Sequence, residues 1–286
     1  MIALLGILVV IGSVLGGFGM AKGPFATLYQ PAELVTICGA AFGTIMISTP
    51  IKVLKHLGQM FPTIFKGSPY TKATYIELLT MQFEVFSKMR KNGLLALEED
   101  VADPAASPTF QNYPKFLGNK KAVTFFCDSL KLLIDGTDAG DAEHIMTSDM
   151  ATQQEEGALP AGVMQKVGDA MPALGIVAAV MGIIVTMQSL DGPPEVLGHH
   201  VAAALVGTFL GILFSYGFFQ PLGGAIECIA RDENKYMQCM MVGLISSAQG
   251  ASPRTAIEQV RRVIYTSERP TSVDVAEAVN SIKSRV

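Results

Sequence analysis

Four long apolar stretches constrain this chain more than any other feature of its sequence. A helix needs about 20 mostly apolar residues to cross the roughly 30 Å hydrocarbon core of a bilayer. Four segments approach or reach that length: residues 2–20, 34–49, 168–190 and 201–222. The composition agrees, because 50% of the residues are hydrophobic and only 16% are charged, against about 25% charged in an ordinary soluble domain. We therefore predict an all-α integral membrane protein with four transmembrane helices.

Two polar segments complete the chain, one between the second and third spans and one after the fourth. Apolar residues three and four positions apart predict several helices in them. These cover residues 73–91, 94–100, 120–134 and 141–156 of the loop, and 225–247, 254–265 and 272–284 of the tail. The expected organisation has four parts: spans one and two (1–49), a large helical cytoplasmic domain (50–168), spans three and four (169–222) and a helical cytoplasmic tail (223–286).

The distribution of basic residues predicts the orientation. Of the 21 lysines and arginines, 12 lie in residues 50–166, most others follow residue 222, and Lys22 is the one in the two short connections. Segments rich in Lys and Arg remain on the cytoplasmic side. Both polar segments and both termini are therefore expected in the cytoplasm.

The central parts of the spans carry no Asp, Glu, Lys, Arg or His. Glu33 lies at the outer edge of span two, and Asp169 and Glu227 lie at inner boundaries. Membrane channels and pumps normally carry an ionisable group within the membrane. If this protein moves ions, we expect the titrating carboxylate to come from another chain.

Two prolines lie near the cytoplasmic ends of consecutive spans, Pro172 in the third and Pro221 in the fourth. Taken singly, Pro172 fits a helix start and Pro221 a helix stop. A proline inside a helix removes one backbone donor and weakens the helix locally. Because the two are expected at similar depth, where membrane helices meet soluble segments, the pair favours a hinge.

Small residues one helical turn apart occur in every span, and they allow helix backbones to approach closely. The four pairs are Gly12 and Gly16, Gly39 and Gly43, Ala178 and Gly182, and Gly207 and Gly211. They predict a tightly packed bundle with oligomeric contacts. The few hydroxyl side chains in the spans, Thr208 and Ser215 among them, are expected to bond back to helix carbonyls.

The sequence carries no enzyme signature. It has no phosphate-binding glycine loop, no Gly-x-Ser-x-Gly turn and no cluster at metal-ligand spacing. We therefore expect no enzymatic activity, no cofactor and no metal. With a net charge of −4 and no basic footprint, nucleic acid is not an expected partner. The charged stretch MRKNGLLALEEDVAD fits a solvated helical hairpin or a two-signed surface for a charged partner.

Seven segments together carry a family resemblance: LLGILVVIGSVLGGF, LYQPAELV, YTKATYIELL, GLLALEED, VGDAMPALGIVAAVMG, LVGTFLGILFSYGF and YTSERP. They span essentially the whole chain, and the sequence resembles the MotA family of flagellar stator subunits, within the MotA/TolQ/ExbB proton channels. The resemblance implies a multi-pass protein of the bacterial inner membrane. It also implies a homo-oligomeric ring, expected as a pentamer around a dimer of MotB, which supplies the membrane Asp.

The resemblance assigns roles to six residues. Pro172 and Pro221 couple ion passage to the cytoplasmic domain, Arg90 and Glu98 face charged groups of the rotor protein FliG, and Thr208 and Ala179 line the channel. Sodium-driven relatives carry a threonine at the position of Ala179, so protons are the expected ion. Three alternatives stay open: a sodium-driven stator, an ExbB/TolQ-like energiser of outer-membrane transport, and a structural membrane scaffold.

Overall fold

The computed structural model describes residues 2–188 and 193–282, apart from the side chains of Glu195 and His199. All regular elements in these ranges are helices, and four of the helices are long and apolar enough to cross a membrane. The predicted all-α class and the four spans are confirmed. The chain divides into two compact units: unit 1 comprises residues 2–67 and 157–229, and unit 2 comprises residues 68–156 and 230–282.

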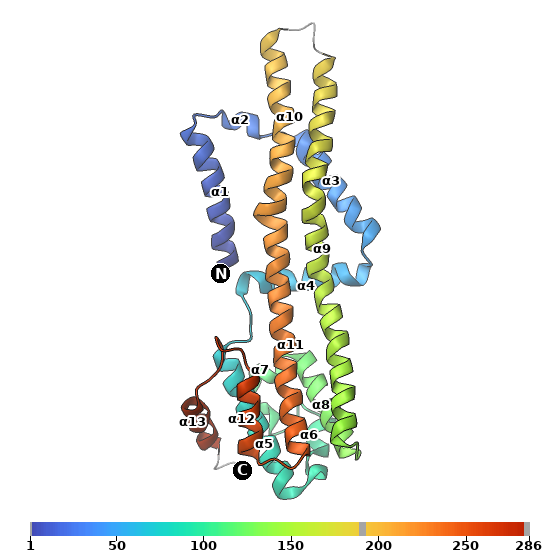
Figure 1. Ribbon diagram of the computed structural model, residues 1–286, viewed down its shortest axis with the longest axis vertical. Helices are drawn as coiled ribbons and strands as arrows, with labels where there is room; N and C mark the ends of the chain where they lie inside the picture. The colour runs from blue at the N-terminus through green and yellow to red at the C-terminus, as the bar shows by residue number, and fades with distance from the viewer. Residues whose placement is uncertain (1, 189–192, 283–286) are drawn as a thin grey trace. The chain divides into compact units, whose positions relative to one another are not determined.

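Unit 1 contains the four candidate spans. In chain order its elements are α1 (Ile2–Met20), α2 (Phe25–Leu28), α3 (Pro31–Ser48), α4 (Ile51–Lys66), the second part of α9 (Ala139–Met187), α10 (Pro194–Phe214), the π-helical turn η3 (Ser215–Phe219) and the first part of α11 (Gln220–Ala248). The first span has its predicted bounds. The second begins at Pro31 and so includes Glu33, and residues 189 and 190 of the third lie outside the described residues (Figure 1).

Two boundaries in the sequence-based prediction are wrong. The predicted helix 141–156 and the third span form one helix, α9, which contains Pro160 and Pro172 in its interior. Likewise the fourth span continues through η3 into α11, with Pro221 as the second residue of α11. Pro172 is therefore not a helix start and Pro221 is not a helix stop. A proline inside a membrane helix is tolerated when neighbouring groups satisfy the freed carbonyl.

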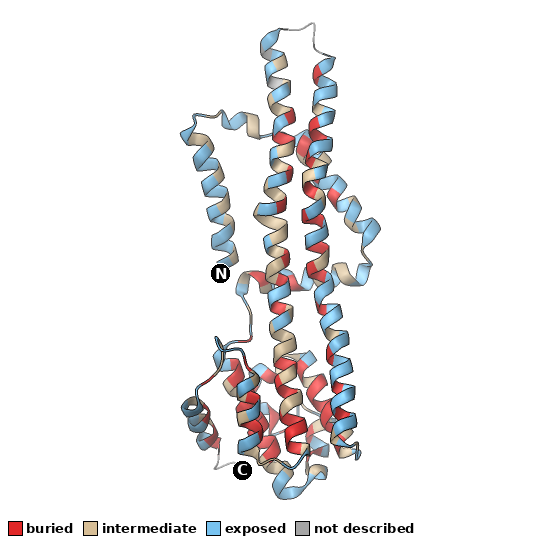
Figure 2. Cartoon of the chain, viewed as in Figure 1, coloured by how far each residue is buried: buried red, intermediate tan, exposed pale blue. Residues whose placement is uncertain are grey.

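Burial differs sharply among the spans of unit 1 (Figure 2). α1 has no buried residue, whereas α3 and α9 contribute the buried cluster around Ile37 and Met171, against which partly buried residues of α10 pack. α4 packs Met60 and Ile64 against the beginning of α11 and the adjoining part of α9. α4 is not among the predicted helices, although its lysines and its apolar residues lie on opposite faces at helical spacing.

Unit 2 is a helical domain built around α5 (Lys72–Asn92). The other elements are η1 (Leu94–Leu97), α6 (Glu98–Ala102), η2 (Phe110–Asn112), α7 (Pro114–Leu117), α8 (Lys120–Ile134), α12 (Pro253–Val263), α13 (Ser272–Ile282) and parts of α9 and α11. The predicted helices 73–91 and 120–134 are confirmed to within one residue at each end. The predicted helix 272–284 is described as far as Ile282.

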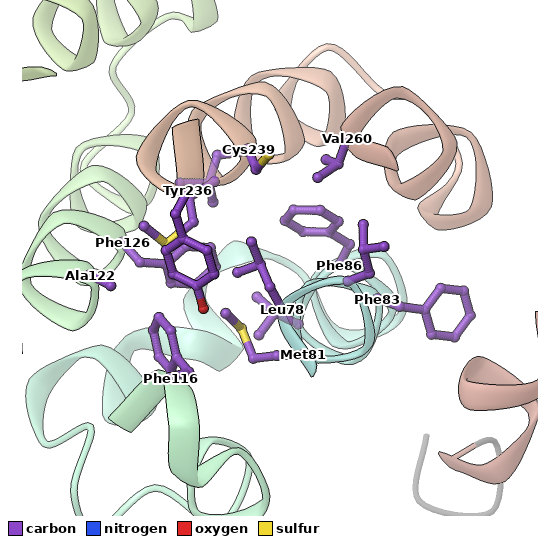
Figure 3. Packing of buried hydrophobic residues seen from close by; sticks show 14 of the residues in the cluster. Leu78, Met81, Phe83, Phe86, Phe116, Ala122, Phe126, Tyr236, Cys239 and Val260 are labelled. Atoms are coloured by element: carbon purple, nitrogen blue, oxygen red, sulfur yellow. The ribbon is translucent and has the colours of Figure 1, made fainter. Parts of the chain in front are cut away.

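The core of unit 2 joins segments far apart in the sequence (Figure 3). Phe86 of α5, Phe126 of α8 and Tyr236 of α11 are at most 1% exposed. Gln82 is also fully buried, and its amide donates to the carbonyls of Cys239 and Met240 at 3.4 and 3.2 Å. Because a buried amide is unfavourable without partners, these bonds allow α5 to occupy the centre of the domain.

Candidate functional site in the membrane-spanning unit

Small residues bring α9 and α10 into direct backbone contact. A Cβ on Gly175 would lie 2.8 Å from the carbonyl oxygen of Gly207 and 3.0 Å from Cα of Gly211. One turn further along α9, Ala179 lies against Gly207, and Gly182 lies against Ala204. The pairing runs in opposite directions along the two helices, so this is an antiparallel contact that depends on missing side chains. The prediction of close packing is confirmed for Gly182, Gly207 and Gly211.

The small-residue pairs of the first two spans behave differently. A Cβ on Gly12, Gly16, Gly39 or Gly43 would meet nothing within 4 Å. These glycines therefore do not mediate helix contacts within the described part of the chain. They leave smooth faces on α1 and α3 that a neighbouring helix can approach closely.

Glu33 lies at the end of the second span, as expected, but its side chain is buried. It lies in the first turn of α3 but is only 8% exposed, and it shares one face of that helix with Ile37 and Ala41. Its carboxyl group is directed at the α9–α10 contact, since a Cβ on Gly207 would lie 2.6 Å from Oε2. The spacing of four residues from Glu33 through Ile37 to Ala41 was readable as one helix face, but the opposing glycines are far away in the sequence.

The two proposed channel-lining residues lie beside this contact. Ala179 is 8% exposed and packs on Gly207, and Thr208 is the next residue of α10 and is half-buried. Other hydroxyl side chains in the spans differ in whether they bond to a helix carbonyl. Thr186 donates to the carbonyl of Gly182 at 2.8 Å as expected, whereas Ser215 is fully buried and its Oγ has no hydrogen-bond partner among the described residues.

The two prolines have different local settings. Pro172 lies in uninterrupted α-helix, with the buried Met171 beside it. Pro221 follows η3, in which the N–H of Gln220 reaches back five residues to the carbonyl of Ser215. A proline has no N–H to offer the carbonyl four residues earlier, and π-turns occur where the regular ladder is interrupted, frequently at functional sites.

Pro172 and Pro221 are offset from each other along the paired helices of unit 1. Gly168 packs against Gln220, and the amide of Gln220 donates to Asp169 at 3.0 Å. Residues next to Pro221 therefore face residues that precede Pro172 by about one turn of α9. With a rise of 1.5 Å per residue, the two prolines are offset by at least about 5 Å along the helices. The antiparallel register between distant segments, which sets this offset, is not encoded locally.

The expected rotor-contacting residues occupy a tight hairpin in unit 2. Arg90 is exposed in the last turn of α5, Gly93 makes the turn with φ +82°, and Glu98 is exposed at the start of α6. A basic residue at a helix C-terminus and an acidic residue at a helix N-terminus both agree with the helix dipoles. The exposed Leu95, at 71%, lies between them in sequence.

One ion pair of the same charged stretch is internal. Lys88 contacts Asp100 at 2.6 Å, and the Asp100 side chain is 4% exposed and also accepts from Ser107 at 2.6 Å. This pair fastens α6 to α5, so these two charges serve the hairpin itself. Arg90 and Glu98 remain on the surface, where they are available to a partner.

No group of three or more metal-ligating side chains occurs among the described residues. The arrangement is a helix bundle in which small residues allow helix backbones and the carboxyl group of Glu33 to approach one another closely.

Comparisons with known proteins cover nearly the whole chain. Residues 4–93 match the family described as Motility protein A N-terminal, and residues 119–238 match the MotA/TolQ/ExbB proton channel family. Motility protein A of Escherichia coli K12 is 40% identical over 285 residues, which cover 99% of this chain and 97% of that protein. Chemotaxis protein LafT of Vibrio parahaemolyticus is 33% identical and covers 93% of this chain and 94% of its own length.

Two solved structures share the fold. The flagellar MotAB stator complex from Bacillus subtilis contains a chain with a TM-score of 0.77 and 25% identity, covering 94% of this chain and 98% of that one. A chain of C. jejuni MotAB gives a TM-score of 0.78 at 22% identity, with the same coverage of both chains.

Proposed function

The chain belongs to the MotA/TolQ/ExbB proton channel family and is a flagellar stator subunit, and from this membership and the geometry of unit 1 we propose that it passes protons together with a MotB partner and turns their flow into torque on the rotor. The family is one of stators and proton channels and not an enzyme family. Its members and the apolar helices support a multi-pass protein of the inner membrane.

The similarity over 99% of the chain carries the assignment, and it favours a stator over an ExbB/TolQ-like energiser or a scaffold. Partnership with MotB and oligomeric assembly follow from the stator complexes that share the fold. We propose further that the ring is a pentamer around a MotB dimer. The open glycine faces of α1 and α3 support further helix contacts.

Protons are the proposed ion, with sodium as the alternative. Ala179 is buried against Gly207 beside Thr208, and an apolar methyl group at this position offers no oxygen ligand to Na⁺, a cation that prefers oxygen donors. A proton crossing a 100 mV potential releases about 2.3 kcal/mol. Neutralising the Asp supplied by MotB changes the free energy of placing that side chain against the helix surface around Thr208. This change drives one step of rotation of the ring.

Pro172 and Pro221 are proposed to transmit the step, and Arg90 and Glu98 to deliver it to charged groups of FliG. The π-turn before Pro221 supports such a role because it leaves the α10–α11 helix less regularly bonded at this point. Contacts between charged groups at an exposed hairpin steer association and weaken with salt. The abundance of Lys and Arg in the polar segments supports termini in the cytoplasm.

Expression in a strain that lacks its own stator tests the function. We expect the chain with its MotB partner to restore swimming, and the speed to follow the proton gradient and not the sodium gradient. Replacement of the partner's Asp by Asn should abolish proton flux. Swimming speed that followed sodium would overturn the choice of ion, and failure of wild type to restore rotation in several hosts would overturn the proposed function.

A further inference from the structure

The carboxyl group of Glu33 is an unexplained polar group inside unit 1. It is 8% exposed, while Ile37 and Ala41 on the same face of α3 are at most 3% exposed. Its Oε2 atom is buried without a hydrogen-bond partner among the described residues. Buried polar side chains are normally paired, and an exception in a folded protein calls for a reason.

Three helices form a cradle for this carboxyl group. α3 supplies the side chain, and a Cβ on Gly207 of α10 would lie 2.6 Å from Oε2 and 3.2 Å from the carboxyl carbon. A Cβ on Gly182 of α9 would lie 3.3 Å from Oε1. The cavity that holds the group therefore exists because two residues from different helices have no side chain.

The charged form is the unfavourable form in this cradle. A carboxylate oxygen that is buried without a donor or a cation nearby loses its hydration and gains nothing in return. The neutral carboxyl loses far less. The packing of α3 on α9 and α10 thus favours a bound proton, and ionisation favours separation of the helices or arrival of a donor.

Few other ionisable groups face this site. α3 carries none besides Glu33 and the exposed thiol of Cys38, and α9 carries none between Asp169 and its end at Met187. On α10 the nearest is His200, one turn before Ala204, and Glu195 and His199 precede it with undescribed side chains. Lys22 and Tyr29 lie in the connection that leads into α3.

We propose that Glu33 is a proton-binding site of this chain itself, at which a proton from the outer aqueous phase is held before it moves inward to the acid of the partner. The proposal rests on the proposed function and its orientation, which place the first turn of α3 on the outer side. The carboxylate takes up one proton to become a neutral carboxyl, and it returns to the carboxylate when the proton passes on. The spans of this chain then contribute an acid of their own, in contrast to the expectation from sequence.

Two substitutions separate ionisation from packing. Glu33→Gln keeps the size and shape of the side chain but cannot bind or release a proton, and Glu33→Asp keeps the acid on a shorter stem. Glu156→Gln is a matched control because Glu156 is an exposed acid of α9 in the other unit. Each variant is expressed with the MotB partner in stator-deficient cells, and membrane levels are measured to verify assembly.

Proton flux and swimming speed are measured between external pH 5 and 8. We expect Glu33→Gln to assemble normally and to lose at least tenfold in flux, Glu33→Asp to retain partial flux with a shifted pH profile, and the control to match wild type. A glutamine variant with wild-type flux and pH profile overturns the proposal, because that result means that the side chain only fills space. The proposed function survives that result, since it depends on rotation by the wild-type chain.

Infrared spectroscopy of the purified complex gives a readout independent of flux. In complexes whose partner Asp is replaced by Asn, so that this acid gives no signal, a protonated carboxyl stretching band at neutral pH should be present with Glu33 intact and in Glu156→Gln, and absent in Glu33→Gln. If the glutamine variant does not assemble, the band is sought in Glu33→Asp, where it should shift in frequency. An unchanged band in every assembled variant overturns the proposal.

Discussion

The contact between α9 and α10 predicts a large effect from adding a single methyl group. In Gly211→Ala the new Cβ would lie 2.6 Å from the carbonyl oxygen of Met171 and 2.9 Å from Cα of Gly175. Ordinary non-bonded contacts are about 3.5–4.0 Å, so the helices must separate by about 1 Å. Both opposing atoms belong to the backbone, and no side-chain rotation can relieve the overlap.

The magnitude follows from two opposing effects. Overpacking costs about 1–3 kcal/mol, and the upper end applies here because backbone must move. Alanine is favoured over glycine in a helix by about 1 kcal/mol. The expected net loss is about 2 kcal/mol, which corresponds to a fall of about 4–8 °C in apparent Tm at 2–4 °C per kcal/mol.

Thermal unfolding of the detergent-purified complex at one fixed scan rate measures this effect. Gly162→Ala is the matched control, because a Cβ on Gly162 of α9 would meet nothing within 4 Å. The control should be unchanged or slightly stabilised. Equal apparent Tm values for Gly211→Ala and wild type would refute the argument that missing side chains hold these two helices together.

Three further predictions concern charged side chains of unit 2. Lys88→Met leaves the nearly buried Asp100 without its ion-pair partner. Because Lys88 itself is about a third exposed, the free energy of unfolding should fall by about 2 kcal/mol, which is less than for a fully buried pair. Urea unfolding measures this loss. Two arginine neighbours, Arg261 and Arg262, hold the pKa of Glu258 at about 2, below its usual 4.5. The stabilisation of the folded state by these contacts is therefore present at neutral pH and is lost as the pH falls from about 4.5 towards 2. Glu258→Gln should remove this part of the acid sensitivity of unfolding. Arg90→Glu should slow swimming and be partly rescued by reversing the charge of its rotor partner, whereas a lack of rescue across the candidate partner residues would argue against direct contact.

Local sequence signals were sufficient to predict the ends of helices that are fixed by neighbouring residues in the chain. α8 begins after Asn119, whose side chain caps the N–H of Ala122 at 3.2 Å. α5 ends at Gly93, which takes a positive φ of 82° that glycine adopts without strain. Capping residues and glycines of this kind are visible in the sequence, and both ends were predicted to within one residue.

Signals that depend on distant packing gave the wrong result. From the sequence, Pro172 predicts a helix boundary, but in the helix bundle α9 continues through it. Glu33 reads as a boundary residue, yet Gly182 and Gly207, well over a hundred residues away, enclose its carboxyl group. Burial of a polar group is a property of the tertiary contact, so no window of sequence around Glu33 could reveal it.

The turn before Pro221 offers a test of how the fourth span joins α11. Pro221 has no N–H, so the carbonyl of Gly217 lacks its usual donor four residues on, and the chain makes a π-turn over the same residues. Pro221→Ala restores that donor, and we expect the segment 215–221 to close into regular α-helix. Backbone hydrogen exchange should slow across these residues. Rotation should fail while assembly persists, because closing the wider π-turn changes the directions of the side chains near the turn, where one residue corresponds to about 100° of helix rotation. Pro160→Ala restores a donor within α9 where no π-turn exists, so it should slow exchange locally without stopping rotation. Unchanged exchange at 215–221 in Pro221→Ala would mean that packing of α1 on Gly217, where a Cβ would lie 3.2 Å from Val10, and not the missing donor, holds the turn in place.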